Sequence, residues 1–348
     1  MGRLSFLKFL TDQWEFIPAV EPQDITGKTV LVVGANVGLG FEAARHLAAM
    51  SPGKLILTSR DLKKGDIAAE DIRKDTGFQN IAVRTVDLCV FSSVVEFVEE
   101  FERQEERLDI LLHNAGMTNN TFETTTNGWE VVLQVNAMSC MLLCVSLLPL
   151  MLKTAAKNTK AVSRPRIVVV SSDTHYWCKF TPLELASANL LGKLNDREHC
   201  SDPTVIARRY TTTKLLNVFF VRELAERLSQ DPPVIVNAVN PGLCHSKLRR
   251  DWGLAATVRS LVFISLFART TEVGSRTLVW AATAAGHRER DLHGGYVSTN
   301  EVKEVSDFAL SEEGLRMQGQ VWDEMTEVLG KVSPRFKAIV NESLRKKV

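Results

Sequence analysis

Tyr210 and Lys214 are the residues whose types and spacing most directly suggest chemistry. They lie four positions apart in the run Tyr-Thr-Thr-Thr-Lys, so an α-helix would place both on one face. A free phenol has a pKa of about 10 and gives up its proton poorly near neutral pH. A neighbouring ammonium lowers that pKa because it favours the tyrosinate. The pair could therefore supply a proton to the alkoxide that forms when hydride reduces a carbonyl, although the same spacing is also common on solvated helices.

A glycine-rich turn follows the apolar run Thr29–Val33, which is typical of a buried parallel strand. Within it, Gly34 permits a tight turn, Gly38 leaves space for a pyrophosphate against backbone N–H groups, and Gly40 lets the following helix pack closely. A strand before the turn and a helix after it predict a dinucleotide-binding site. The residues of the turn expected to contact the cofactor are Gly34, Asn36, Gly38, Leu39 and Gly40.

The second expected strand, 54–58, ends in Ser59-Arg60-Asp61, about 20 residues after the glycines, where a dinucleotide enzyme meets the adenosine ribose. An acid there would accept a hydrogen bond from the ribose 2′-OH, whereas a cation would pair with a 2′-phosphate. Asp61 is explained equally well as the cap of a helix over 62–76. Arg60 has no second role beyond that of a solvated surface arginine. The sequence therefore favours NADP(H) over NAD, which is kept as the alternative.

Strand and helix patterns alternate along the chain. Ser92 is expected to cap a helix, and 129–151 to form one long apolar helix whose last turns are bent by Pro149. Right-handed crossovers between successive strands give an α/β fold: a single Rossmann-like, doubly wound parallel sheet with helices on both faces. The expected strands are 29–33, 54–58, 81–86, 108–112, 166–170, 234–239 and 295–298; the other expected helices begin near Leu39 and Ser92 or span 62–76, 210–228 and 272–285.

The domain organisation predicted from these patterns is an N-terminal arm (1–25), one NADP-binding oxidoreductase domain (26–330) and a C-terminal tail (331–348). The arm carries several aromatic residues and is expected to pack on the body or over the substrate mouth, with a membrane-surface helix as the alternative. The domain includes an apolar lid at about 243–270. Its most apolar part, 253–268, is interpreted as a helix pair or lid because it is short for a transmembrane span.

Together these motifs resemble the short-chain dehydrogenase/reductase family over roughly residues 26 to 300. The family's glycine turn usually begins with Thr, where this chain has Val33. Arg60 stands where NADP-preferring members carry arginine. The matching positions are the tetrad Asn136, Ser172, Tyr210 and Lys214, the strand-end motif Asn114-Ala115-Gly116, the turn Pro241-Gly242, the nicotinamide-contacting Ser246, and Asp87 with Leu88 near the adenine.

The resemblance implies a role for each member of the tetrad. Tyr210 is the proton donor, and Lys214 lowers its pKa and holds the nicotinamide ribose. Ser172 binds the substrate oxygen, and Asn136 anchors a water that relays protons past Lys214. Ser171, the neighbour of Ser172, is expected to be a strand-end hydroxyl bonded to backbone. A long insertion between Ser172 and Tyr210 looks most like the retinol-dehydrogenase branch, and fungal reductases of secondary metabolism share the same build.

Composition limits the classes of function. The 348 residues are 45% hydrophobic with a formal net charge of +1 and no basic block, so no nucleic-acid partner is expected. The six cysteines lack a C-x-x-C pair, which favours a reduced, cytoplasmic protein with at most peripheral membrane association. No zinc spacing links the His–Cys neighbours, so no metal is expected. His175 and Tyr176 are interpreted as lining the substrate mouth or as ordinary loop residues.

The sequence as a whole predicts an NADP(H)-dependent oxidoreductase that interconverts a ketone or aldehyde and an alcohol on a lipophilic small molecule of retinoid, steroid, terpenoid or polyketide type. The chain is expected to act as a monomer or homodimer. Two alternatives stay open: an NAD-linked alcohol dehydrogenase, and a catalytically idle scaffold that senses NADP(H). An intact tetrad argues against the scaffold, because a scaffold needs no Tyr210 and Lys214 together.

Overall fold

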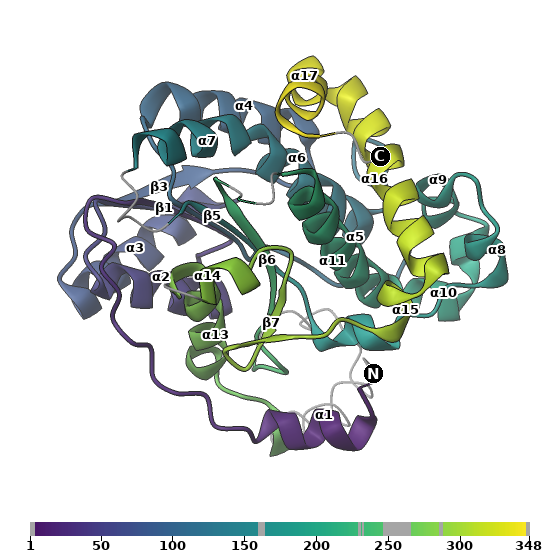
Figure 1. Cartoon of the computed structure of the whole chain (residues 1–348), viewed down its shortest axis with the longest axis horizontal. Helices are drawn as coiled ribbons and strands as arrows, with labels where there is room; N and C mark the ends of the chain where they lie inside the picture. Colours follow the sequence, from purple (N-terminus) through teal and green to yellow (C-terminus); the bar gives the residue numbers. More distant parts are fainter. Residues whose placement is uncertain are drawn as a thin grey trace.

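The computed structural model describes residues 4–158, 164–228, 231, 233–245, 266–284 and 288–345. Within these ranges the centre of the molecule is one sheet in the order β3-β2-β1-β4-β5-β6-β7-β8 (Figure 1). All neighbouring strands run parallel except β7 and β8, which are antiparallel. The strands are β1 (Thr29–Val33), β2 (Lys54–Ser59), β3 (Ile81–Thr85), β4 (Ile110–His113), β5 (Arg166–Val170), β6 (Ile235–Asn240), β7 (Tyr296–Ser298) and β8 (Glu301–Lys303).

Helices cover both faces of this sheet, which confirms the predicted fold class. Successive residues of a strand face opposite sides, so Val30 and Val32 join the core under α2 and α13, while Leu31 and Val33 join the core under α4, α6 and α11. The longer helices are α1 (Phe6–Gln13), α2 (Gly38–Ala49), α3 (Leu62–Thr76), α4 (Phe91–Gln104), α6 (Ser139–Ser146), α7 (Leu148–Lys157), α11 (Arg209–Arg227), α13 (Thr271–Thr283), α16 (Glu312–Val332) and α17 (Pro334–Ser343).

Short helices complete the connections. Several of them occupy the long excursion between β5 and α11. They are α5 (Val131–Leu133), the π-helical η1 (Gln134–Met138), the 3-10 helices η2 (Asp173–Trp177) and η3 (His199–Ser201), and α8 (Pro182–Leu185), α9 (Leu190–Leu194), α10 (Pro203–Ala207), α14 (Arg288–Asp291) and α15 (Asp307–Leu310).

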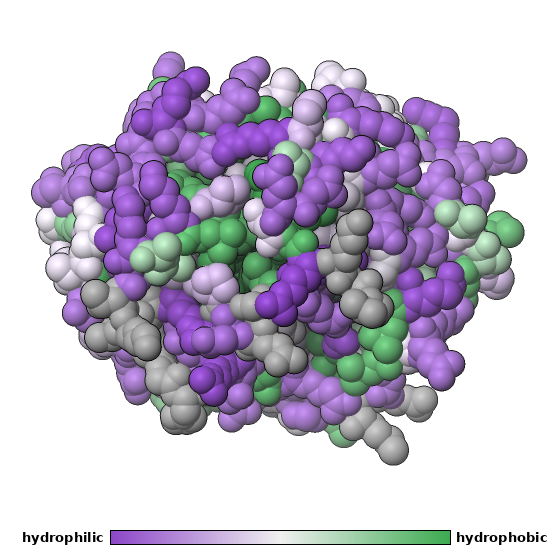
Figure 2. All heavy atoms as spheres, turned by 45° about the horizontal axis from the view of Figure 1, so that its top comes forward, coloured by the Kyte–Doolittle hydropathy of each residue, from purple (hydrophilic) through white to green (hydrophobic). Residues whose placement is uncertain are grey.

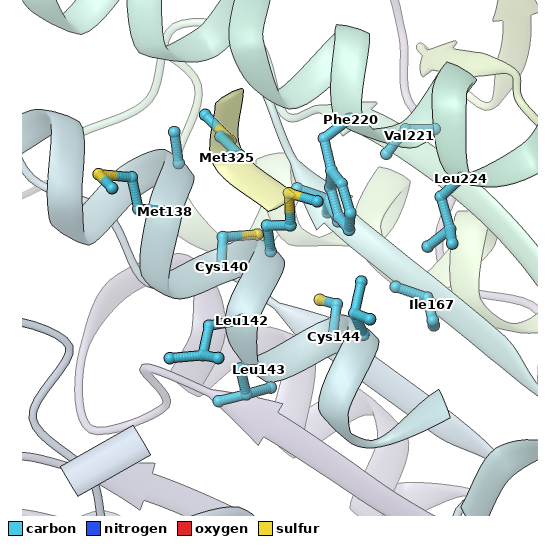
Figure 3. Close-up of a cluster of buried hydrophobic side chains, with 14 of the residues drawn as sticks. Met138, Cys140, Leu142, Leu143, Cys144, Ile167, Phe220, Val221, Leu224 and Met325 are labelled. Carbon is cyan, nitrogen blue, oxygen red and sulfur yellow. The ribbon is translucent and has the colours of Figure 1, made fainter. Parts of the chain in front are cut away.

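Helix α6 lies at the centre of the larger core. All eight of its residues are buried, and Figure 3 shows Cys140 and Cys144 among apolar side chains from β5, α11 and α16. All six cysteines are free thiols, and those on α6 are the small core residues that the sequence predicted. The helix therefore fixes the position of η1, which directly precedes it.

One local prediction was wrong, and a second was right only in part. Ser92 does not cap α4, because that helix begins at Phe91 and its N-cap residue is Val90. The N–H of Phe91 is instead satisfied by the side chain of Asn127, 36 residues away. The helix predicted over 129–151 is bent close to Pro149, as expected, but it divides there into two helices. It breaks at Leu147, and Pro149 lies in the first turn of α7, where a missing N–H costs nothing.

The C-terminal region contributes elements for which the sequence analysis assigned no structure. Strand β8 pairs antiparallel with β7 at the edge of the sheet. Helix α16 packs on α11, and α17 packs on α16 and α6. Phe336 of α17 is fully buried in the same core as α6, so this region closes the helical layer on that face.

One face of the molecule is predominantly polar. Figure 2 shows this face, on which hydrophilic side chains surround a smaller central area of hydrophobic ones. In the described part of the chain, no single helix is long and apolar enough to cross a membrane. One bent pair, Val131–Ser146 with Leu148–Lys157, reaches the required length and composition together, and its α6 portion is wholly buried.

A buried ion pair joins the start of α11 to the start of α5. Arg209 Nε lies 3.2 Å from Glu130 Oε2, and both side chains are almost fully buried. Glu130 also accepts hydrogen bonds from the N–H groups of Val132 and Leu133, and burial raises the pKa of its carboxyl. Since Arg209 precedes Tyr210, the pair ties the helix that carries Tyr210 to the segment that carries Asn136.

We expect Arg209→Met to lower the free energy of unfolding by about 3–5 kcal/mol, because it leaves the Glu130 carboxylate buried and uncompensated. Urea unfolding at pH 7 measures this loss. The matched control is Lys331→Met, which breaks the exposed pair with Glu327 and should cost less than about 0.5 kcal/mol. Equal losses in the two variants would contradict the structural importance of the Arg209–Glu130 pair.

Candidate active site

The glycine turn between β1 and α2 has the geometry that the sequence predicted. Gly34 has a φ of 80°, in the left-handed region that favours glycine. A Cβ on Gly40 would lie 2.2 Å from the Gly34 carbonyl oxygen and 2.5 Å from Asn114 Nδ2, so only glycine allows this close packing. Asn114 Nδ2 donates to that same carbonyl oxygen at 2.8 Å. The turn is therefore locked to the end of β4.

The start of α2 has the features of an anion site. Its N-cap residue, Val37, offers no side-chain cap, and no acidic residue lies in its first turn. A Cβ on Gly38 would meet nothing closer than 4.0 Å, so the backbone faces open space. Unsatisfied N–H groups and the helix dipole attract a phosphate at such a terminus. The residues present thus fit the pyrophosphate of a dinucleotide. Asn36 and Leu39, which were also predicted to contact the cofactor, are half-buried in the same turn.

At the end of β2, Asp61 and Arg60 are the two candidates for contact with the adenosine ribose, and they differ in their surroundings. Asp61 is the N-cap of α3, and its side chain accepts from Lys64 N, so the capping interpretation is confirmed. Arg60 is exposed. At the end of β3, Asp87 Oδ1 accepts from Cys89 N, and the Leu88 carbonyl accepts from Ser139 Oγ of α6. Cofactor contact by Arg60, Asp87 and Leu88 stays a prediction.

Lys214 is the point at which several predicted residues meet. A Cβ on Gly116 would lie 3.3 Å from Asn136 Oδ1 and 3.5 Å from Lys214 Nζ. The ammonium is buried and donates to the Val170 carbonyl at 2.8 Å. Asn136 lies in η1, accepts from Met117 N and donates to Thr213 Oγ1 of α11. The segment around Gly116, the π-helical η1 and helix α11 thus meet at Lys214, although they lie far apart in sequence. The π-helix is itself a common mark of functional sites.

Tyr210 and Lys214 share one side of α11. Lys214 Nζ lies 5.5 Å from the centre of the Tyr210 ring, and Tyr210 is half-buried. Burial lowers the pKa of Lys214 to about 8, because it disfavours the charged ammonium. The predicted pair is therefore brought together with the lysine inward and the phenol towards the more accessible side.

The two serines after β5 differ in their partners. Ser171 is buried, and its hydroxyl donates to the Lys214 carbonyl at 2.9 Å, so the expected backbone bond is confirmed. Ser172 is half-buried, and its Oγ accepts from Thr174 N. Ser172 is thus the more accessible hydroxyl. Its contact with substrate stays a prediction.

A buried polar network behind Ser172 was not found by the sequence analysis. Asn240 Oδ1 accepts from the N–H groups of both Asp173 and Gly242, while its Nδ2 donates to Asp173 Oδ1 at 2.6 Å. Tyr296 also donates to Asp173. One side chain therefore links the segment after Ser172 to the Pro241-Gly242 turn. The only local signals were the positions of Asp173 and Asn240 beside predicted site residues.

His175 holds this segment in place as a neutral side chain. It is buried, with Nδ1 2.8 Å from the Ser172 carbonyl and Nε2 accepting from Ser306 N. Burial lowers its pKa to about 4. Tyr176 donates its hydroxyl to the Glu304 carbonyl. Of the two interpretations of this pair, these contacts support ordinary loop residues.

Part of the predicted site cannot be compared with the structure. Ser246 and residues 253–265 of the apolar segment lie outside the described residues. Over the described ranges, no group of three or more His, Cys, Asp or Glu side chains is arranged to hold a metal ion.

Lys214 gives a stability prediction with a definite sign. Its pKa is about 8 in the folded protein against 10.5 ordinarily, so the unfolded chain binds more protons between these values. Stability should therefore rise with pH across this window, by up to about 3 kcal/mol. Between pH 7 and 10.5, the free energy of unfolding of wild type, measured in urea, should rise by this amount relative to that of Lys214→Met. A difference between the two proteins that does not change with pH would contradict a buried ammonium.

Comparisons with known proteins identify the family. A family model described as short chain dehydrogenase matches residues 28–176. A short chain dehydrogenase/reductase of Cryptosporiopsis sp. is 36% identical and covers 89% of this chain and 92% of its own. A short chain dehydrogenase of Emericella nidulans is 38% identical over 80% of this chain and 86% of its own.

Solved structures share the fold. A short chain dehydrogenase of Shigella flexneri complexed with NADP superposes with a TM-score of 0.58 at 21% identity, over 81% of this chain and all of its own. A Pseudomonas aeruginosa RhlG/NADP complex gives a TM-score of 0.57 at 19% identity, over 79% and 95% of the two chains. The identities over nearly the whole length show that this chain belongs to the short-chain dehydrogenase/reductase family and is an oxidoreductase.

Proposed function

We propose that this protein is an NADP(H)-dependent reductase of a ketone or aldehyde on a lipophilic small molecule, able to catalyse the reverse oxidation. The observation that carries the proposal is the placement of Tyr210 on the same side of α11 as the buried Lys214 ammonium, next to Asn136 and Gly116. This arrangement is what a proton transfer to a developing alkoxide needs.

The cofactor would lie across the carboxyl ends of the strands, as ligands do in doubly wound sheets. The N-terminus of α2 with Gly34, Gly38 and Gly40 would receive the pyrophosphate. Asn114, Ala115 and Gly116 would border the ribose next to Lys214, and Pro241 with Gly242 would face the nicotinamide. When bound, the nicotinamide supplies the hydride. Several related folds were solved with NADP or NADPH, which supports this choice of cofactor.

The chain's own residues would then handle the proton. Tyr210 donates it to the substrate oxygen while Ser172 holds that oxygen by a hydrogen bond. The Lys214 ammonium stabilises the tyrosinate left behind, because opposite charges lower the pKa of the phenol. Asn136 is fixed by Met117 and Thr213, so it can anchor a water that returns a proton past Lys214.

Arg60 supports NADP over NAD. It is exposed at the ribose end of β2, and the neighbouring Asp61 is committed to capping α3. An exposed guanidinium suits a 2′-phosphate through charge-assisted hydrogen bonds. The NAD-linked alternative would need the capping carboxylate of Asp61 to accept a hydrogen bond from the ribose 2′-OH as well. The scaffold alternative would leave the Tyr210–Lys214 pair without a use.

The proposed substrate class rests on the composition of two segments of the chain. Aromatic side chains of the N-terminal arm and the apolar 253–268 segment favour a lipophilic substrate. The relatives named above come from fungi, which supports a place in fungal secondary metabolism. A cytoplasmic location with at most peripheral membrane contact, and a monomeric or homodimeric state, belong to the same proposal.

The first test concerns the proton donor. Tyr210→Phe should lower kcat at least about a hundredfold, the usual scale of general acid catalysis, with unchanged NADPH affinity. Turnover is followed by NADPH oxidation on a panel of retinoid, steroid, terpenoid and polyketide carbonyls. Tyr176→Phe removes another phenolic hydroxyl, one bonded to a backbone carbonyl, and should stay within a few-fold of wild type. Turnover of Tyr210→Phe as high as that of this control would refute the assignment.

The second test concerns the 2′-phosphate. Arg60→Ala should weaken NADPH binding by roughly 1.5–3 kcal/mol, the range for hydrogen bonds to charged groups, and leave NADH binding nearly unchanged. Calorimetric titration with both cofactors measures this. Arg103→Ala, at the far end of α4 with an exposed side chain, is the matched control. Equal losses for NADPH and NADH in Arg60→Ala would show that Arg60 does not recognise the phosphate.

A further inference from the structure

Helix α1 contacts the two loops that follow β5 and β6, although it lies far from them in sequence. Figure 1 shows α1 at the bottom of the view, joined to β1 by a long connection without regular structure. Trp177, at the end of η2 after Ser172, donates from Nε1 to the Leu4 carbonyl at 3.0 Å. The ring of Phe9 meets the Trp177 ring edge-on at 5.1 Å. The helix is thus anchored on the loop after β5.

The other anchor of α1 is the turn after β6. Gln13 has a buried side chain, and its Oε1 accepts from the N–H of Leu243 at 2.8 Å. The pair joins residues 230 positions apart. A buried N–H without an acceptor would cost the full desolvation of that group. Gln13 therefore supplies the hydrogen-bond acceptor for the Leu243 N–H, directly after Pro241-Gly242.

Arg269 completes the same connection. Its guanidinium donates to the carbonyls of Asp12 and Gln13 at the end of α1, and to the Pro241 carbonyl at 3.3 Å. A cation at the C-terminus of a helix is stabilised by its unpaired carbonyls. Backbone hydrogen bonds of Arg269 with Leu243 and His245 hold this arginine beside the turn.

The contact with Gly242 is close. Gly242 has a φ of 78°, and a Cβ there would lie 2.8 Å from Arg269 Nη1 and 3.0 Å from Gln13 Oε1. The N–H of Gly242 is held by Asn240 Oδ1. The polar backbone groups of the turn, from Pro241 O to Leu243 N, thus have partners from β6, α1 and Arg269. One of these partners, Gln13, belongs to the N-terminal helix, and Arg269 also binds the carbonyls at the end of that helix.

We propose that α1, through Gln13 and Arg269, is a positioning element of the nicotinamide site. It holds the Pro241–Leu243 turn in the conformation that receives the nicotinamide end of the cofactor, and Gln13 is a positioning residue rather than a catalytic one. The inference rests on the proposed NADP(H) function. It assigns the N-terminal arm to the active site and predicts that the arm acts on one end of the cofactor only.

The test compares two ligands that share the adenosine end. NADPH reaches the turn after β6, whereas 2′,5′-ADP has the 2′-phosphate and adenine without the nicotinamide. Gln13→Met removes the acceptor of the Leu243 N–H with little change of volume. The turn of the free variant rearranges to solvate the orphaned Leu243 N–H, and NADPH must restore it on binding. We therefore expect the Kd of this variant for NADPH to rise about fivefold to a hundredfold, with the full cost of an unsatisfied buried donor as the upper limit. Its Kd for 2′,5′-ADP should stay within twofold of wild type in calorimetric titrations.

Two further variants serve as controls. Gln13→Glu keeps an acceptor beside the Arg269 guanidinium and should retain NADPH affinity. Leu7→Ala changes an exposed residue of the same helix and should alter neither Kd. If Gln13→Met lowers Tm below the assay temperature, Gln13→Asn replaces it, since it withdraws the acceptor by one methylene.

The outcomes separate the two proposals. Wild type that binds neither ligand would refute the NADP(H) function, and the inference with it. Wild type that binds both, with a Gln13 variant that binds NADPH normally or loses both ligands equally, would overturn the inference alone. A selective loss of NADPH affinity supports both.

Discussion

The structure depends on the burial of one ammonium group. Lys214 is almost fully buried, and an isolated cation in such a place is costly unless polar partners surround it. The Val170 carbonyl at the end of β5 accepts from it, and Ser171 returns a hydrogen bond to the backbone of the same residue. Strand β5 and helix α11 are therefore fixed relative to each other at the point where chemistry is proposed. Gly116 lies beside both Asn136 of η1 and the ammonium, since a Cβ on it would lie 3.3 Å from Asn136 Oδ1 and 3.5 Å from Lys214 Nζ.

The parallel sheet explains why these groups meet. Strands β1, β4, β5 and β6 run in the same direction, so their carboxyl ends lie along one edge. Each end delivers one component: the glycine turn, Asn114-Ala115-Gly116, the two serines, and Pro241-Gly242. The close contact of Gly40 with the Gly34 carbonyl, and the bond from Asn114 to that oxygen, join the first two components. Asn240 joins the last two through Asp173 and Gly242.

Features encoded locally were predictable, and features that depend on distant contacts were not. The buried run Thr29–Val33 and the glycines after it define a strand and a turn without outside help, and Asp61 caps α3 as a local motif does. The prediction that Ser92 caps α4 was wrong because the side chain of Asn127 accepts from the first N–H of that helix, on Phe91. The break at Leu147 lies two residues before Pro149, which is a local signal, whereas the packing of α17 on α6 follows from tertiary contacts that no short window contains. The role of Gln13 could not be predicted from the sequence for the same reason, since its partner Leu243 lies 230 residues away.

This division between local and distant contacts coincides with the two ends of the cofactor site. The family model matches residues 28–176, which contain the β1–α2 turn, Arg60, Asn114 and the serines but neither Tyr210 nor the turn after β6. The proposed adenosine end is built from the glycine turn after β1 and the end of β2, and Asn114 at the end of β4 holds that turn. The proposed nicotinamide end would be built from α11, β6, Arg269 and α1, which touch only after the chain has folded. Changes in the N-terminal arm can therefore alter the nicotinamide and substrate side, while the glycine turn and the end of β2 keep their own geometry.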